Sequence, residues 1–133
     1  MENLKKRFEQ PLNEIISIIS KLGWKRLDNW ARNYYVNPHE GKIYSVSKTS
    51  GKLKQLNSKP GSNGYCTVKL KGLDGKYHTK SEHKLIVDAY YPSDVNKPLC
   101  HHKDHDRTNN RLSNLERISY KSNSRRRKDN ERN

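Results

Sequence analysis

Glycine-containing turns divide the region from residue 34 to residue 80 into short strand-like segments, and no other feature limits the fold as strongly. Segments 42–46 and 52–56 flank a turn at 49–51, and a glycine-rich loop follows at 60–64. Short strands joined by tight turns pair as antiparallel neighbours. The sequence therefore predicts a small antiparallel sheet in this region.

A hairpin with a strongly basic face is predicted at residues 65–80. Residues 65–71 alternate between apolar and polar side chains, and Asp74-Gly75 is a two-residue turn signal. With that turn, Lys71 faces His78 across the hairpin. Like charges across a ladder repel each other, and a DNA phosphate backbone would relieve the repulsion. The predicted DNA-docking face, for which an ordinary solvated face is the alternative, carries Lys69, Lys71, Lys76, His78 and Lys80.

Helices are predicted on both sides of the strands. Between Pro11, which suits a first turn, and Gly23, which suits a cap, apolar residues recur at helical spacing, namely Leu12, Ile15, Ile16, Ile19 and Leu22. We expect this stripe to pack on the chain's own sheet, anchored by Trp24 and Trp30, and a dimer seam is the alternative. The second helix extends from an N-cap at Ser81 to residue 90, with Glu82 as a first-turn acid and His83 as a packing residue.

Composition indicates the class of partner. The 133 residues suffice for one compact domain, or for a small catalytic module with flanking binding elements. Hydrophobic residues make up 30% and charged residues 32%, so the core should be small. The 28 Lys and Arg against 14 Asp and Glu give a net charge of +14, which favours nucleic acid as a partner. Basic ribosomal and packaging proteins share this balance, so the charge does not indicate catalysis.

The cysteines and the hydropathy exclude two further classes of protein. Cys66 and Cys100 lack a second cysteine at metal-ligand spacing, which excludes a zinc ribbon, and we interpret both as reduced core thiols. No apolar run approaches the roughly 20 residues of a membrane span. Residues 1–10 are charged where a signal peptide is apolar. We therefore expect a cytoplasmic protein with no membrane contact.

The segment 100–106 concentrates three histidines and two aspartates, a density unusual outside metal or acid-base sites. Residues 115–118 are strand-like, and Ser119 can cap a basic helical run at 120–127. The predicted order is strand, loop, strand, helix. Alternation points His101 and His102 to opposite sides of the first strand, so one can ligate a metal ion while the other transfers a proton. Hydrolysis of a phosphodiester needs both functions.

Several separated motifs occur in an order that resembles the phage-type HNH homing endonucleases. They cover about the last half of the chain, at residues 83–92, 96–98, 102–104, 108–111, 114–116 and 122–123. Weaker matches, at 24–27, 35–36 and 41–45, resemble the DNA-binding module that often precedes the nuclease in that family. The resemblance implies an α+β fold. An N-terminal helix and small antiparallel sheet (residues 1–80) would precede a ββα-metal (HNH) nuclease region (residues 81–133).

The resemblance also implies roles for four side chains. His102 matches the general base, Asn114 the residue that braces the loop and orients the base, and Asn123 a metal ligand on the helix. His101 stands where homing members usually have Asp or Asn, and a His-His pair is similar to the colicin-type nucleases, in which the first histidine is a ligand. One divalent ion is implied, first Mg²⁺ or Mn²⁺. Because imidazole favours transition metals, Co²⁺, Ni²⁺ and Zn²⁺ are further candidates.

The turn after the histidines is a second departure from the family pattern. His105 stands where the family tends to have glycine, which puts the local turn geometry in question. We interpret Asp104 as a turn-stabilising residue, with a supporting role behind the metal ligands as the alternative.

These expectations combine into a metal-dependent HNH endonuclease of the homing type, which nicks or cuts duplex DNA with water activated by a histidine. Basic side chains outside the hairpin would also hold the DNA, namely Lys52, Lys54, Arg125, Arg126 and Arg127. We expect a monomer or weak dimer, in the host cytoplasm if the gene is phage-encoded. Because the chain ends at Asn133, sequence discrimination would rest on the N-terminal sheet. The alternatives are a non-catalytic DNA-binding regulator and a ribosome-associated RNA-binding protein.

Overall fold

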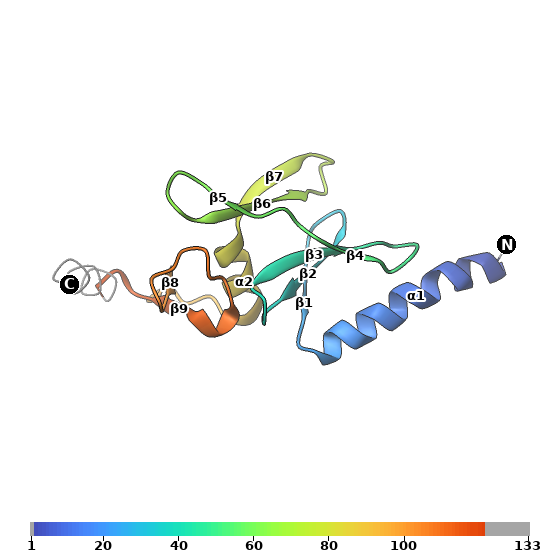
Figure 1. Cartoon of the computed structure of the whole chain (residues 1–133), viewed down its shortest axis with the longest axis horizontal. Helices are drawn as coiled ribbons and strands as arrows, with labels where there is room; N and C mark the ends of the chain where they lie inside the picture. Colours follow the sequence, from blue (N-terminus) through green and yellow to red (C-terminus); the bar gives the residue numbers. More distant parts are fainter. Residues whose placement is uncertain (1, 122–133) are drawn as a thin grey trace.

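The computed structural model describes residues 2–121, with side chains from residue 12 onward (Figure 1). Helix α1 (Glu2–Lys21) precedes strands β1 (Lys25–Leu27), β2 (Asn33–Asn37), β3 (Lys42–Val46) and β4 (Leu53–Gln55). Strands β5 (Lys59–Pro60), β6 (Cys66–Lys71) and β7 (Tyr77–Ser81) lead into helix α2 (Glu82–Tyr90). Strand β8 (Leu99–His102), the short 3-10 helix η1 (Leu112–Asn114) and strand β9 (Leu115–Ile118) follow.

The strands of the described residues form three antiparallel sheets. Strands β1 to β4 make the N-terminal sheet, β5 to β7 the middle sheet, and β8 and β9 a two-stranded hairpin. Helix α2 lies at the centre of the molecule with the sheets around it (Figure 1). The predicted α+β fold is confirmed.

Helix α2 organises the main core because its apolar face packs against all three sheets. Ile86 and Val87 are buried in one cluster with side chains from each sheet, namely Leu27, Tyr34, Val36, Ile43, Val68, Leu70 and Leu115. The Lys71 amide also donates to Tyr34 Oη over 2.8 Å, which links the middle and N-terminal sheets. Within the described residues, the predicted regions 1–80 and 81–133 thus contribute to one core. The separate DNA-binding and nuclease roles assigned to the two regions stay a prediction.

Helix α1 is longer than predicted. It begins at Glu2, so Pro11, which was expected in the first turn, lies within the helix. The expected packing on the chain's own sheet is present, because Ile19 is buried with Tyr35 and Val46. The side chains that pack around them include Leu12, Ile15, Ile16 and Trp24. Leu22 is 56% exposed, and Trp30 packs against the main core instead.

The β6–β7 hairpin forms, but its predicted register is wrong by one residue. Gly72 N donates to Lys76 O over 2.7 Å and closes a three-residue loop at 73–75, in which Gly75 has a φ of 81°. The observed pairs are Lys69 with Thr79, Lys71 with Tyr77, His78 with Leu70 and Lys80 with Val68. A shift of one residue turns each side chain of a strand to the other face. The predicted face that unites all five basic residues is therefore absent.

The corrected register divides the basic residues of the hairpin between two faces. Lys69 and Lys71 share a face with Lys59, which pairs with Thr67. His78 lies on the other face, where its ring meets Trp30 edge-on at a centroid distance of 6.1 Å. His78 Nε2 also lies 3.0 Å from Asp74 Oδ2. His78 therefore packs against Trp30 and contacts Asp74 at the end of the hairpin.

Both cysteines are free, in agreement with the prediction of unpaired thiols. Cys66 is buried in β6, and burial raises the pKa of the Cys100 thiol to about 12. Among residues 2–121, no helix is both long enough and apolar enough to cross a membrane.

Candidate active site

The β8–β9 hairpin places the two neighbouring histidines on opposite faces, as strand alternation predicts. His101 pairs with Glu116, and its Nδ1 lies 3.0 Å from Glu116 Oε1. His102 pairs with Leu115 and is only 4% exposed. Residues 120 and 121 are helical, so the strand, loop, strand order is followed by the beginning of a helix.

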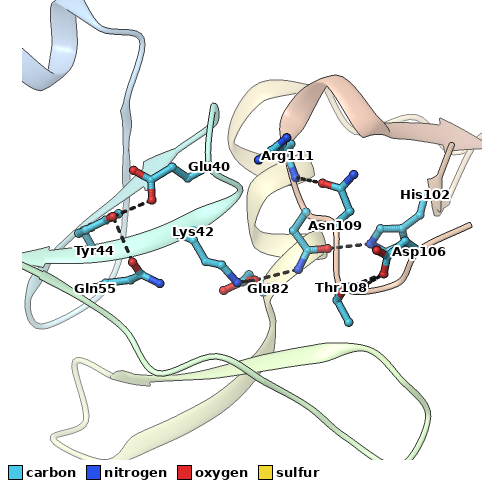
Figure 2. A network of polar contacts seen from close by, with 11 residues as sticks. Glu40, Lys42, Tyr44, Gln55, Glu82, His102, Asp106, Thr108, Asn109 and Arg111 are labelled. Carbon is cyan, nitrogen blue, oxygen red and sulfur yellow. Dashed lines mark hydrogen bonds and ion pairs between the residues drawn. The ribbon is translucent and has the colours of Figure 1, made fainter. Parts of the chain in front are cut away.

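A buried chain of polar contacts ends at His102 (Figure 2). His102 Nε2 lies 2.7 Å from Asn110 Oδ1, and Asn110 Nδ2 donates to Glu82 Oε1 over 2.8 Å. Lys42 Nζ lies 3.5 Å from the same carboxylate oxygen. Glu82 is 0% and Asn110 1% exposed, so water does not compete for these contacts. The contacts connect β3, α2, the loop at 103–111 and β8.

Sequence reasoning missed Glu82 and Asn110 as site residues. Glu82 was interpreted as an acidic residue in the first turn of a helix, and Asn110 as part of a polar turn. Neither was therefore proposed as a site residue. Their juxtaposition spans 28 positions of the chain, and no local pattern encodes it. The available signal was weak: Glu82 directly precedes an apolar helical stripe and can face the core.

A second histidine, His83, lies beside His102, with ring centroids 5.1 Å apart. Tyr65 stacks on His83 at a centroid distance of 4.8 Å. Burial, assisted by the nearby His102 and Lys84, lowers the pKa of His83 to about 4. His83 Nδ1 is buried and lacks a hydrogen-bond partner among the described residues. The neutral ring therefore agrees with the packing role expected for it.

The low pKa of His83 predicts a loss of stability in acid. An imidazole in the unfolded chain has a pKa of about 6.5, so between that pH and about 4 the unfolded state binds more protons than the folded state. The free energy of unfolding therefore falls as the pH decreases through this window. We expect His83→Phe to shrink the fall in urea-derived unfolding free energy from pH 7 to pH 5 by about 1–2 kcal/mol. The exposed His39 supplies the control, His39→Phe, and an equal fall in both variants would contradict the assignment.

Asn114 closes the loop that follows the histidines. Its Oδ1 accepts from the Asp104 amide over 3.0 Å, and its Nδ2 donates to Asp104 Oδ1 and to Asn109 O, each over 2.9 Å. The Lys103 amide donates to Asn114 O over 2.8 Å. These contacts are those of a residue that braces the loop, and its catalytic importance stays a prediction.

The turn geometry accounts for Asp104 and His105. Asp104 accepts from the Asp106 amide and from Asn109 Nδ2, each over 2.8 Å. Hydrogen bonds, first that from Asn109, lower the pKa of Asp104 to about 2, as expected for a carboxylate that stabilises a turn. His105 has a φ of 65°, in the left-handed region that favours glycine. This position therefore requires the conformation that a glycine would adopt most easily.

Part of the predicted basic set gathers at one groove. A cavity of about 800 Å³ beside β3 and β4 is lined by Lys52, Lys54 and Lys71, together with Arg32 and Lys48. Lys69, Lys76 and Lys80 are exposed on the hairpin, away from this lining. Arg125, Arg126 and Arg127 lie outside the described residues. The groove adds two basic side chains, Arg32 and Lys48, that sequence reasoning did not single out.

Of the two predicted metal ligands, the structure describes the surroundings of His101 but not those of Asn123. Within residues 2–121, no group of three or more His, Cys, Asp or Glu side chains is arranged to hold a metal ion. Asn123, the predicted ligand on the helix, lies outside the described residues. His101 fits the role, because a carboxylate bonded to one ring nitrogen is the usual way to orient a metal-binding imidazole.

Comparison with known proteins identifies the fold. No family model matches the sequence, and no curated protein matches it. The structure of this chain is similar to a solved structure described as "DNA binding and cleavage by the HNH homing endonuclease I-HmuI". The TM-score is 0.67 and the sequence identity is 24%. The similarity covers 80% of this chain and 58% of the I-HmuI chain. The α+β fold described here is thus similar, over most of its length, to part of the fold of this HNH homing endonuclease.

Proposed function

We propose that this chain is a metal-dependent HNH endonuclease that nicks or cuts duplex DNA. The observation that supports the proposal most is the β8–β9 hairpin, which carries His101 and His102 on opposite faces within a fold shared with a DNA-cleaving endonuclease. Each chain has one such hairpin among its described residues, so a monomer would nick one strand. A monomer or weak dimer in the cytoplasm, with a homing role, completes the proposal.

His102 would act as the general base. Its ring would take a proton from the water that attacks phosphorus, and its burial restricts the ring to one orientation. Asn114 would support this step by holding the loop between β8 and β9 through its bonds to Asp104 and Asn109.

His101 and Asn123 would hold the metal ion. When bound, a divalent cation supplies positive charge that stabilises the phosphate and the leaving oxygen. Glu116 would orient His101 through the 3.0 Å contact at Nδ1. Mg²⁺ or Mn²⁺ is proposed first, and the imidazole ligand makes Co²⁺, Ni²⁺ and Zn²⁺ reasonable substitutes.

The basic groove would bind the DNA backbone. Its five cationic side chains line one cavity, and a phosphate chain would neutralise their mutual repulsion. Lys69, Lys76, His78, Lys80 and the arginines at 125–127 are proposed as further contacts. The corrected register means that the hairpin residues cannot all meet one DNA groove from a single face.

Salt dependence tests the groove. We expect Lys54→Gln with Lys71→Gln to weaken binding to duplex DNA and to reduce the log–log salt slope by about 0.9 for each phosphate that is no longer neutralised, or about 1.8 in all. The measurement is fluorescence anisotropy with labelled duplex at several salt concentrations. Lys21→Gln, at the end of α1 and outside the groove lining, is the matched control. A double variant with the slope of the control would exclude the groove as a backbone site.

Plasmid relaxation tests the nuclease. Purified protein with Mg²⁺ or Mn²⁺ should convert supercoiled plasmid to the open circle, and EDTA should stop the reaction. Intact plasmid combined with a retained gel shift would support the DNA-binding regulator instead. Preference for structured RNA over duplex DNA in competition would support the RNA-binding protein.

A further inference from the structure

The contacts of Asn110 determine which way its carboxamide faces. A carboxylate oxygen only accepts hydrogen bonds, so the group that meets Glu82 Oε1 at 2.8 Å must be the Asn110 amide nitrogen. The carbonyl Oδ1 then faces His102 Nε2 at 2.7 Å. Lys42 Nζ, 3.5 Å from Glu82 Oε1, pairs with the carboxylate.

The orientation of Asn110 in turn determines the tautomer of His102. A carbonyl oxygen only accepts, so His102 Nε2 must carry the hydrogen. In a neutral imidazole one nitrogen is a donor and the other an acceptor. His102 Nδ1 is therefore the nitrogen that holds the lone pair, and this pair is what a general base needs.

We infer that Glu82 and Asn110 are positioning residues that fix His102 in the tautomer with hydrogen on Nε2, and that Lys42 completes the arrangement from the N-terminal sheet. The catalytic consequence rests on the proposed function, whereas the tautomer does not. Asn110 meets the ring at Nε2, away from the nitrogen that would accept the proton, and Glu82 and Lys42 act only through Asn110.

Stability alone does not explain a carboxylate at this place. Burying a charge is unfavourable unless its partners compensate, and replacing a buried ion pair with apolar groups is often neutral or stabilising. Glu82 is 0% exposed, and its second oxygen, Oε2, has no hydrogen-bond partner among the described residues. A carboxylate kept under such conditions is better explained by the orientation that it imposes on Asn110.

The N-terminal sheet supports Asn110 by a second, independent contact. The turn between β2 and β3 packs so closely on the loop that a Cβ on Gly41 would overlap the backbone of Asn110 and Arg111. The Leu112 amide also donates to Pro38 O over 3.0 Å. Asn110 is therefore held from both its side chain and its backbone.

The test is Glu82→Gln. This substitution keeps the size of the side chain but replaces the carboxylate, which only accepts hydrogen bonds, with an amide that can also donate them. A glutamine amide can donate to Asn110 Oδ1, so the Asn110 carboxamide can turn and present its nitrogen to His102. We expect ¹⁵N spectra of histidine-labelled protein, at a pH where imidazole is neutral, to show one tautomer at His102 in the wild type and a mixture in the variant. We expect single-turnover nicking to fall about 10- to 100-fold, the usual effect of removing a residue that orients a catalytic group.

Glu40→Gln is the matched control. Glu40 Oε1 likewise accepts from an asparagine amide, Asn37 Nδ2, over 2.9 Å. The contacts of Glu40 lead through Tyr44 to Gln55, and the polar contacts drawn in Figure 2 do not connect them to His102. The Glu40→Gln variant should leave both the ¹⁵N spectrum of His102 and the nicking rate unchanged. The His102→Ala spectrum identifies the His102 signals.

The possible results separate this inference from the proposed function. If the wild type does not nick DNA but Glu82→Gln changes the tautomer, the positioning role stands and the nuclease assignment fails. If the wild type nicks DNA and Glu82→Gln keeps both the single tautomer and the rate, the inference is wrong. A fall in rate with an unchanged tautomer also overturns it, because Glu82 would then act by another route.

Discussion

We expect the replacement of His102 with alanine to lower the proposed nicking of supercoiled plasmid by roughly 10²–10⁴-fold, the contribution of a well-placed general base. The methyl group of alanine cannot take a proton from water, while His101, the proposed metal ligand on the opposite face of the strand, is left in place. The rate is measured in single turnover with saturating Mg²⁺ or Mn²⁺. DNA affinity, measured by gel shift in EDTA, should change little, because the basic groove lies elsewhere.

The same substitution leaves Asn110 Oδ1 without its donor, which we expect to reduce the unfolding free energy by about 1–3 kcal/mol. Rates must therefore be compared at a temperature where circular dichroism shows both proteins folded. His39→Ala is the control, because this exposed histidine lies outside the β8–β9 hairpin and its ring meets the carbonyl of Leu22 at 2.9 Å. Nicking by folded His102→Ala within a few-fold of wild type would show that another group is the base.

Gly41→Ala is expected to destabilise the fold by about 3 kcal/mol or more. Two causes add. Gly41 has a φ of 68°, which costs an L-residue about 1–2 kcal/mol, and the new methyl group would overlap the backbone of Asn110 and Arg111. Backbone cannot move aside as a flexible side chain would, so the turn and the loop must separate. Urea unfolding measures the free energy.

Gly75→Ala separates these two causes. Gly75 has a φ of 81°, but a Cβ there would meet nothing within 4 Å. It should therefore show only the conformational cost, about 1–2 kcal/mol. Equal losses of unfolding free energy in the two variants would mean that the turn at Gly41 is not in close contact with the loop that carries Asn110. We also expect only Gly41→Ala to slow nicking by the folded protein, since only that substitution displaces Asn110.

The sequence predicted the strands well where one face is buried. Cys66, Val68 and Leu70 alternate with polar residues, and the structure buries all three. The register of the hairpin was wrong because Asp74-Gly75 suits both a two-residue turn and the last two positions of a three-residue loop. Local turn signals do not distinguish these two loops, and β7 is too exposed for its burial pattern to determine the register.

The histidines of the site were predictable because they are adjacent in the chain. Strand alternation alone separates His101 from His102, and the spacing to Asn114 followed from the resemblance. Glu82 and Asn110 could not be found in this way, since helix α2 and the loop meet only through tertiary packing. The helix N-terminus of α1 was misplaced because Pro11 is favoured at a first turn, although the structure accommodates it within the helix.

The central position of α2 has a consequence for how such a chain could evolve. Because Ile86 and Val87 are buried against all three sheets, we expect the strands that would bind DNA and the hairpin that would cut it to unfold as one cooperative unit. Recombination at residue 81 would separate α2 from the N-terminal and middle sheets on which it packs. Under the proposed function, a new DNA target preference would therefore be more accessible through point changes on the outer strands than through exchange of whole modules.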